Sequence, residues 1–208
     1  MVKRIVLLLF LLVLCACACF AALGDADDGY LTEGEYDYGV ELFNHDVLIV
    51  EGGGADMIEM WDYSYLEVRY TSIPINGDWH TGGILDILID DYSKLLYLDG
   101  MNDLLSIYDD AKATLKGGTV NHIRSYQYTG TKHIDLYCQP GWSWLYDSPS
   151  VIGGITGLWE SGTAFTIDFI DKTYLGYDPV WMNINIIEIP EPATLLLITL
   201  GAALIRKR

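Results

Sequence analysis

Positive charge is scarce in the body of this sequence. The 208 residues include 12 lysines and arginines against 29 aspartates and glutamates, and five of the basic residues lie at the extreme ends. Between Asp25 and Ile189 this leaves 7 basic and 28 acidic residues, a net charge of −21. Such a body repels nucleic acid and anionic lipid headgroups, so the sequence predicts no nucleic-acid partner.

Cysteine is nearly absent from the same region. Cys15, Cys17 and Cys19 lie near the N-terminus, which leaves Cys138 alone in the body. A single cysteine cannot form an intramolecular disulfide, so a disulfide-stapled fold is excluded once the N-terminal segment is removed. A zinc site is not expected either, and Cys138 is interpreted as a small buried hydrophobic residue.

Known catalytic patterns are missing as well. The sequence has no G-x-S-x-G, no P-loop and no dinucleotide fingerprint, and its four histidines show no ligand spacing: His45, His80, His122 and His133. A polysaccharide lyase needs basic side chains or calcium to neutralise the sugar carboxylate, and only Arg69 and Arg124 are arginines of the body. We therefore predict no catalytic residue, no metal, no cofactor and no enzymatic activity.

One fragment is typical of calcium-binding repeats. Gly52-Gly53-Gly54-Ala55-Asp56-Met57-Ile58 contains G-x-G-x-D followed two residues later by isoleucine. The motif occurs once, whereas such sites need tandem copies. A calcium-stabilised module stays as an alternative.

The N-terminus has the order of a secretory signal peptide. Lys3 and Arg4 precede an apolar run from Ile5 to about Leu14, and small residues follow. Ala22-Leu23-Gly24 predicts cleavage before Asp25, so residues 1–24 form the signal peptide. Cleavage at Ala16-Cys17-Ala18, a lipobox at Leu14-Cys15-Ala16-Cys17 and an uncleaved membrane anchor are the alternatives.

The C-terminus combines three features. Pro190-Glu191-Pro192 keeps the chain extended, an uncharged run follows from Ala193 to Ile205, and the chain ends in Arg206-Lys207-Arg208. The run spans only about 20 Å as a helix, which is marginal for crossing a bilayer and suits a temporary anchor. The basic cluster predicts a cytoplasmic end.

These residues resemble the PEP-CTERM sorting signal of Gram-negative bacteria. The resemblance covers about the last 20 residues, 190–208, and its motif residues are Pro190, Glu191, Pro192, Arg206, Lys207 and Arg208. It implies export, a transient transmembrane helix in the inner membrane, recognition by an exosortase and release to the cell surface or extracellular matrix. It further implies an association with exopolysaccharide and biofilm. An ordinary C-terminal anchor is the alternative.

The body contains an internal repeat of 18 residues. Gly53, Gly82, Gly100 and Gly118 are separated by 29, 18 and 18 residues, and the long step equals 18 plus an 11-residue insertion around "TSIPINGDWHT". Alignment on these glycines gives four apolar columns: Val40, Ile58, Ile87, Leu105, Ile123; Leu42, Met60, Ile89, Ile107, Ser125; Leu48, Leu66, Leu95, Ala113, Thr131; and Val50, Val68, Tyr97, Leu115, His133.

The columns predict strands joined by short turns. Apolar residues come in pairs two apart, the period of a strand, and a polar residue followed by a small one separates the pairs. We expect an all-β fold, a β-solenoid of about five 18-residue coils stacked about 4.8 Å apart. A twisted sandwich of similar hairpins is the alternative.

The expected organisation follows from where the repeat begins and fades. Residues 25–39 are an N-terminal cap or flexible segment, 40–135 the solenoid, and 136–189 a C-terminal β cap that covers its open edge. The tryptophans predicted to form the core of the cap are Trp142, Trp144, Trp159 and Trp181.

Two further columns carry the functional hypotheses. Asp62, Asp91 and Asp109 recur once per repeat, as expected of turn residues, and Tyr63, Tyr92 and Tyr128 lie beside them as candidate carbohydrate contacts. Packing of these tyrosines against one another is the structural alternative. The sequence thus favours a structural or adhesive surface protein, and the rival is a carbohydrate-active β-solenoid lyase or glycosidase that uses the aspartates.

Overall fold

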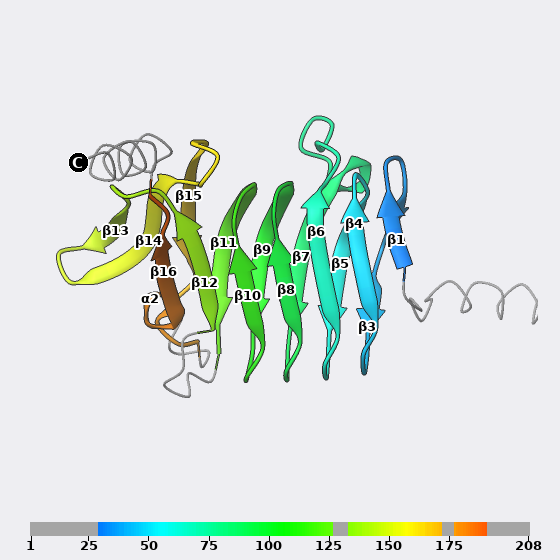
Figure 1. Ribbon diagram of the computed structural model, residues 1–208, viewed down its shortest axis with the longest axis horizontal. Helices are drawn as coiled ribbons and strands as arrows, with labels where there is room; N and C mark the ends of the chain where they lie inside the picture. The colour runs from blue at the N-terminus through cyan, green and yellow to red at the C-terminus, as the bar shows by residue number, and fades with distance from the viewer. Residues whose placement is uncertain (1–28, 127–132, 172–176, 191–208) are drawn as a thin grey trace, which may run out of the picture.

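The protein forms two β-sheets that run side by side along an elongated molecule, shown here as a computed structural model (Figure 1). The structure describes residues 29–126, 133–171 and 177–190. Within these residues strands predominate, and helix is limited to the short α2 (Val180–Asn183) and the 3₁₀ turn η1 (Trp79–Thr81). The prediction of an all-β fold is confirmed.

One sheet has seven strands, every neighbouring pair of which is parallel. In spatial order they are β1 (Gly29–Thr32), β4 (Val47–Glu51), β6 (Tyr65–Tyr70), β8 (Lys94–Tyr97), β10 (Lys112–Leu115), β12 (Ile134–Cys138) and β16 (Ile184–Glu188). Residues 29–37 of the expected N-terminal segment therefore contribute an edge strand, β1, which pairs with β4.

The other sheet has nine strands. Its order is β13 (Ser143–Ser148), β14 (Val151–Leu158), β15 (Ala164–Phe169), β11 (Thr119–Ser125), β9 (Met101–Ile107), β7 (Gly83–Ile89), β5 (Gly54–Met60) and β2 (Tyr36–Asp37), with β3 (Val40–Leu42) also paired to β5. Pairing is parallel from β2 to β15, and antiparallel in β13, β14 and β15.

From β4 to β12 the chain alternates between the two sheets, so each strand pairs with the strand two further along. The register matches the predicted columns: Ile58 pairs with Ile87, Ile87 with Leu105 and Leu105 with Ile123. In the facing sheet Leu66 pairs with Leu95. Equivalent positions of successive repeats therefore lie next to one another, as the 18-residue spacing predicts.

The core lies between the sheets. In β7, Ile87 and Ile89 are fully buried while Leu88 between them is partly exposed, and the other strands alternate in the same way. Full burial of one such side chain stabilises the fold by about 1.5–3 kcal/mol. A single repeat has nothing to pack against, so this contribution requires the stacked arrangement.

The predicted insertion lies between β6 and β7, where it contains η1. At the other end of the repeat two alignments are wrong. Ala113 pairs with Ile134 and Leu115 with Leu136, a step of 21 residues, whereas the columns had placed Thr131 and His133 there. The connection before β12 is three residues longer than the repeat, so His133 precedes the strand. Thr131 lies outside the described residues.

The tryptophans of the C-terminal region divide into two groups. Trp159 is fully buried beneath its hydrogen bond from Nε1 to the carbonyl of Gly118, and Trp142 and Trp144 pack against the core. Trp181, expected in the core, remains 40% exposed. It belongs to α2, a single turn that buries Val180 and Asn183 and directs the tryptophan outward. The prediction for Trp181 is wrong.

The segments expected to be a signal peptide (1–24) and a transmembrane helix (190–208, apart from Pro190) lie outside the described residues. Over 29–126, 133–171 and 177–190, no helix combines the length and apolar character needed to cross a bilayer.

Candidate functional site

The predicted aspartate column occupies the turns that join the nine-stranded sheet to the seven-stranded one. Asn44, Asp62, Asp91 and Asp109 all adopt the left-handed conformation, with φ between 45° and 57°. Asparagine and aspartate tolerate this region better than other residues with a Cβ. The small residues two positions later, Ser64, Ser93 and Ala111, are fully buried beneath the turns. These aspartates are placed as turn residues.

The predicted tyrosine column is a stack. The Tyr63 ring lies parallel to Tyr92, with centroids 5.2 Å apart, and His45 stacks on its other side at 5.5 Å. Tyr63 and Tyr92 are 59% and 51% exposed, mostly through ring edges, because their facing surfaces cover each other. A sugar ring needs an open aromatic face to stack on, so this geometry favours packing between turns. Tyr128 lies outside the described residues.

Three carboxylates come together at one end of this turn column. Oxygens of Asp90, Asp91 and Asp109 lie within 4.8 Å of one another, and burial followed by the Asp109 and Asp91 charges raises the pKa of Asp90. Within the described residues this is the one group close enough to hold a metal ion. Asp56 of the calcium-like fragment is not part of it; that residue lies on β5, in the groove described next.

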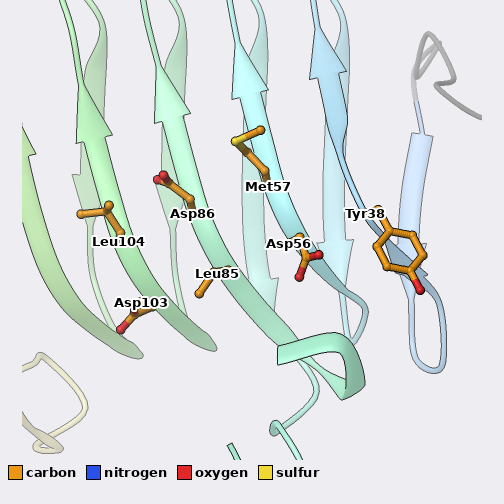
Figure 2. Close-up of a pocket in the computed structure, with 7 residues that line it drawn as sticks. All are labelled: Tyr38, Asp56, Met57, Leu85, Asp86, Asp103 and Leu104. Carbon is orange, nitrogen blue, oxygen red and sulfur yellow. The ribbon is translucent and has the colours of Figure 1, made fainter. Parts of the chain in front are cut away.

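The largest hollow that combines charged and apolar groups crosses the outer face of the nine-stranded sheet (Figure 2). It has a volume of about 370 Å³, and we call it the outer groove. Its lining residues are Tyr38, Asp56, Met57, Leu85, Asp86, Asp103 and Leu104.

An irregularity shared by β5, β7 and β9 creates the outer groove. In β5, Ala55 and Ile58 are buried, so the two residues between them both face outward. The same occurs between Ile84 and Ile87 in β7. A regular strand would expose only every second residue. Each strand therefore presents an adjacent carboxylate and apolar side chain.

Asp56 lies at one end of the outer groove in a small hydrogen-bond network. The Tyr36 hydroxyl donates to Asp56 Oδ1 and lies 2.9 Å from His80 Nδ1, which is itself 3.2 Å from Asp56. Burial and this hydrogen bond raise the pKa of Tyr36. Tyr38 packs edge-on against Tyr36 and stays 75% exposed, so it has an aromatic face open to solvent.

Asp86 lies in the middle of the outer groove. Ser106 Oγ donates to Asp86 Oδ1 at 3.2 Å, Arg124 Nε donates to the same Ser106 oxygen at 2.8 Å, and the Arg124 guanidinium is 3.6 Å from Asp86. Burial raises the pKa of Asp86 in spite of the opposing effect of Arg124. Its charge is thus only partly compensated.

The third carboxylate, Asp103, accepts a hydrogen bond from Asn121 Nδ2 at 2.9 Å. His122 Nδ1 lies 3.5 Å from the same carboxylate oxygen of Asp103 and 3.2 Å from its carbonyl. A second hollow of about 200 Å³ adjoins the outer groove, shares Tyr38 and Met57 with it, and adds Glu41 and Glu59.

Sequence reasoning did not find the outer groove. It located the tyrosines beside the turns and read the strands as alternating, which hides the paired outward residues. A signal was present: Met57, Leu85 and Leu104 are large apolar residues next to aspartates, at positions facing away from the core.

The sorting motif begins where sheet pairing stops. The Ile189 N–H donates to the Cys138 carbonyl at 2.9 Å, and Pro190, which follows, is exposed and has no N–H. The other motif residues, Glu191, Pro192, Arg206, Lys207 and Arg208, lie outside the described residues.

Comparisons with protein-family models, with curated proteins and with solved structures found no match to this chain.

Proposed function

We propose that this chain is an exported bacterial surface or extracellular-matrix protein whose body is a short β-solenoid that adheres to polysaccharide. The supporting features of the fold are the 18-residue register, the alternation between two parallel sheets and the buried apolar columns. A stack of about five coils gives a stiff body with flat faces, which suits a structural or adhesive role.

The observation that carries the adhesive role is the outer groove with Tyr38 at its end. Carbohydrate sites combine an open aromatic or apolar surface for the C–H face of a sugar with polar groups for its hydroxyls. Tyr38, Met57, Leu85 and Leu104 supply the first, and the three aspartates supply hydrogen-bond acceptors. The stacked Tyr63 and Tyr92 offer no comparable face.

The test measures binding of the full chain, purified in a non-ionic detergent, to a panel of immobilised neutral, amino-sugar and uronic-acid polysaccharides. We expect retention on at least one of them and loss of retention in Tyr38→Ala. Tyr146→Ala is the matched control, because Tyr146 is 60% exposed on β13, away from the groove. Absence of binding to every polysaccharide contradicts the proposal, as does equal loss in both variants.

The export route is proposed from the C-terminal resemblance, and the exposed Pro190 supports it. A processing enzyme needs an extended segment free of sheet pairing, and the chain leaves the sheet at this residue. In a host that contains an exosortase, a tag placed after Arg208 should be lost from the mature protein at the cell surface. Retention of the tag in surface-located protein, or no change when the exosortase is deleted, contradicts this route.

A glycosidase is the second candidate, because two carboxylates of the outer groove have different environments. Burial raises the pKa of Asp86, as a general acid requires, while Asp56 is held by Tyr36 and His80. Incubation with the same polysaccharides should then release new reducing ends, and Asp86→Asn should abolish the release. Asp91→Asn, in the turn column, is the control. Absence of products rules this candidate out.

A further inference from the structure

The outer groove presents acidic and apolar side chains in alternation. In one row Met57 pairs with Asp86, and Asp86 with Leu104, across β5, β7 and β9. The residues immediately before them form a second row in the opposite order: Asp56, Leu85 and Asp103. Figure 2 shows the two rows, with Tyr38 at the end of the second.

The rows run across the strands. Neighbouring strands are about 4.8 Å apart, which is close to the advance of one pyranose unit along an extended glycan. A linear polysaccharide lying across β5, β7 and β9 therefore meets one carboxylate and one apolar side chain at each sugar. A ligand lying along a single strand meets only one such pair.

The face around the outer groove has an excess of negative charge. Among the described residues, Arg69, Lys94, Lys112 and Lys116 belong to the seven-stranded sheet or directly follow its β10, and only Arg124 lies on the nine-stranded sheet. Arg124 is already close to Asp86. The remaining carboxylates of the face include Asp56, Asp103, Glu41 and Glu59.

Glu59 shows what this excess does. Burial, followed by the nearby charges of Glu41 and Asp86, raises its pKa, so its ionised form is disfavoured where it stands. A cation bound on this face would relieve that repulsion. Uronic-acid polymers carry the wrong charge, because their carboxylates would face the same repulsion.

From the alternating rows and this charge we propose that the outer groove binds a linear polysaccharide with free amino groups, a de-N-acetylated hexosamine polymer. The sugar rings lie across β5, β7 and β9, their apolar faces contact Met57, Leu85 and Leu104, and their ammonium groups pair with Asp56, Asp86 and Asp103. This inference rests on the proposed adhesive function and specifies its ligand.

The test is isothermal titration calorimetry of the full chain with a glucosamine hexasaccharide, its N-acetylated counterpart, a uronic-acid oligomer and oligolysine. We expect the glucosamine oligomer to bind at least about tenfold more tightly than the N-acetylated one, with affinity falling as salt rises. Asp103→Asn should weaken that binding by about three- to tenfold.

Asp110→Asn is the matched control, since Asp110 is an exposed carboxylate outside the groove and its replacement changes the net charge equally. Equal loss in both variants means general attraction of an acidic protein to a polycation and overturns the inference. So does oligolysine binding that is as tight and as dependent on Asp103. Equal binding of both hexosamine oligomers overturns this inference and leaves the adhesive function standing. Failure of every oligosaccharide to bind overturns both.

Discussion

Asp62 accepts a hydrogen bond through Oδ2 from the backbone N–H of Asn44, at 3.2 Å, from the turn 18 residues further along the chain. Asp91 does the same for the Asp62 N–H at 3.3 Å. All three residues are left-handed, with φ of 55°, 57° and 54°. One residue type thus provides both the backbone conformation of the turn and a link to the neighbouring turn.

Replacement of Asp62 separates these two contributions. Asp62→Asn keeps the tolerance for positive φ and an acceptor oxygen, so the free energy of unfolding should change by less than about 0.5 kcal/mol. Asp62→Ala loses both and should cost roughly 2 kcal/mol. Urea unfolding of the full chain, followed by circular dichroism, measures the difference. Equal stability of the two variants contradicts this account of the turn.

Gly118 tests the close approach of neighbouring glycine turns. Its φ is +73°, and a Cβ there would lie 2.7 Å from the Gly100 carbonyl oxygen, a backbone atom that cannot move aside. Gly118→Ala should therefore destabilise the protein by at least about 2 kcal/mol.

Gly39→Ala is the control for Gly118→Ala, because a Cβ at Gly39 meets nothing within 4 Å and φ there is ordinary. Its effect on the unfolding midpoint should be within about 0.5 kcal/mol of zero. A comparable loss in both variants shows that tight stacking of the turns is not what limits position 118.

The repeat was predictable because its signal is local and redundant. Apolar residues two apart, a polar turn residue and a glycine recur at fixed spacing, so the register from Val40 to Ile123 follows from the sequence. The insertion announced itself as an 11-residue excess. Left-handed turns at Asn44 and Asp62 agree with the residue types found there.

The end of the repeat and the outer groove were not predictable in the same way. The step from Ala113 to Ile134 is three residues too long, and its length is set by the β11–β12 connection rather than by the apolar pattern. In the outer groove, Asp56 and Met57 face outward together, which a period of two cannot indicate. How aromatic rings of one column stack is likewise decided in three dimensions, as Tyr63 and Tyr92 show.

Glu59 gives a pH-dependent prediction whose sign follows from its surroundings. Burial and the charges of Glu41 and Asp86 raise its folded-state pKa above the ordinary 4.5, so the folded state holds the proton more tightly than the unfolded state. Its charge is destabilising at neutral pH, and the penalty disappears as the pH falls through the folded pKa toward 4.5.

Glu59→Gln should therefore stabilise the protein at neutral pH by about 0.5 kcal/mol or less, since the side chain remains partly solvated, and the gain should vanish in acid. Thermal melts of the full chain across this pH range measure it. Glu160→Gln, an exposed residue between β14 and β15, is the control and should show no such trend. A gain that grows as the pH falls reverses the sign and contradicts the argument.

Cys138 should be unreactive in the folded protein. Its side chain is fully buried in β12, and burial, followed by the charge of Glu188, raises the pKa of the thiol to about 11. Alkylation requires the thiolate and access to it, so iodoacetamide should modify Cys138 at least about a hundredfold more slowly in the native protein than in urea. Peptide mass spectrometry assigns the label to Cys138 separately from Cys15, Cys17 and Cys19. Rapid native labelling at Cys138 would mean that β12 opens readily at its pairing with β16, and would place the weak point of the fold at the strand from which the sorting motif extends.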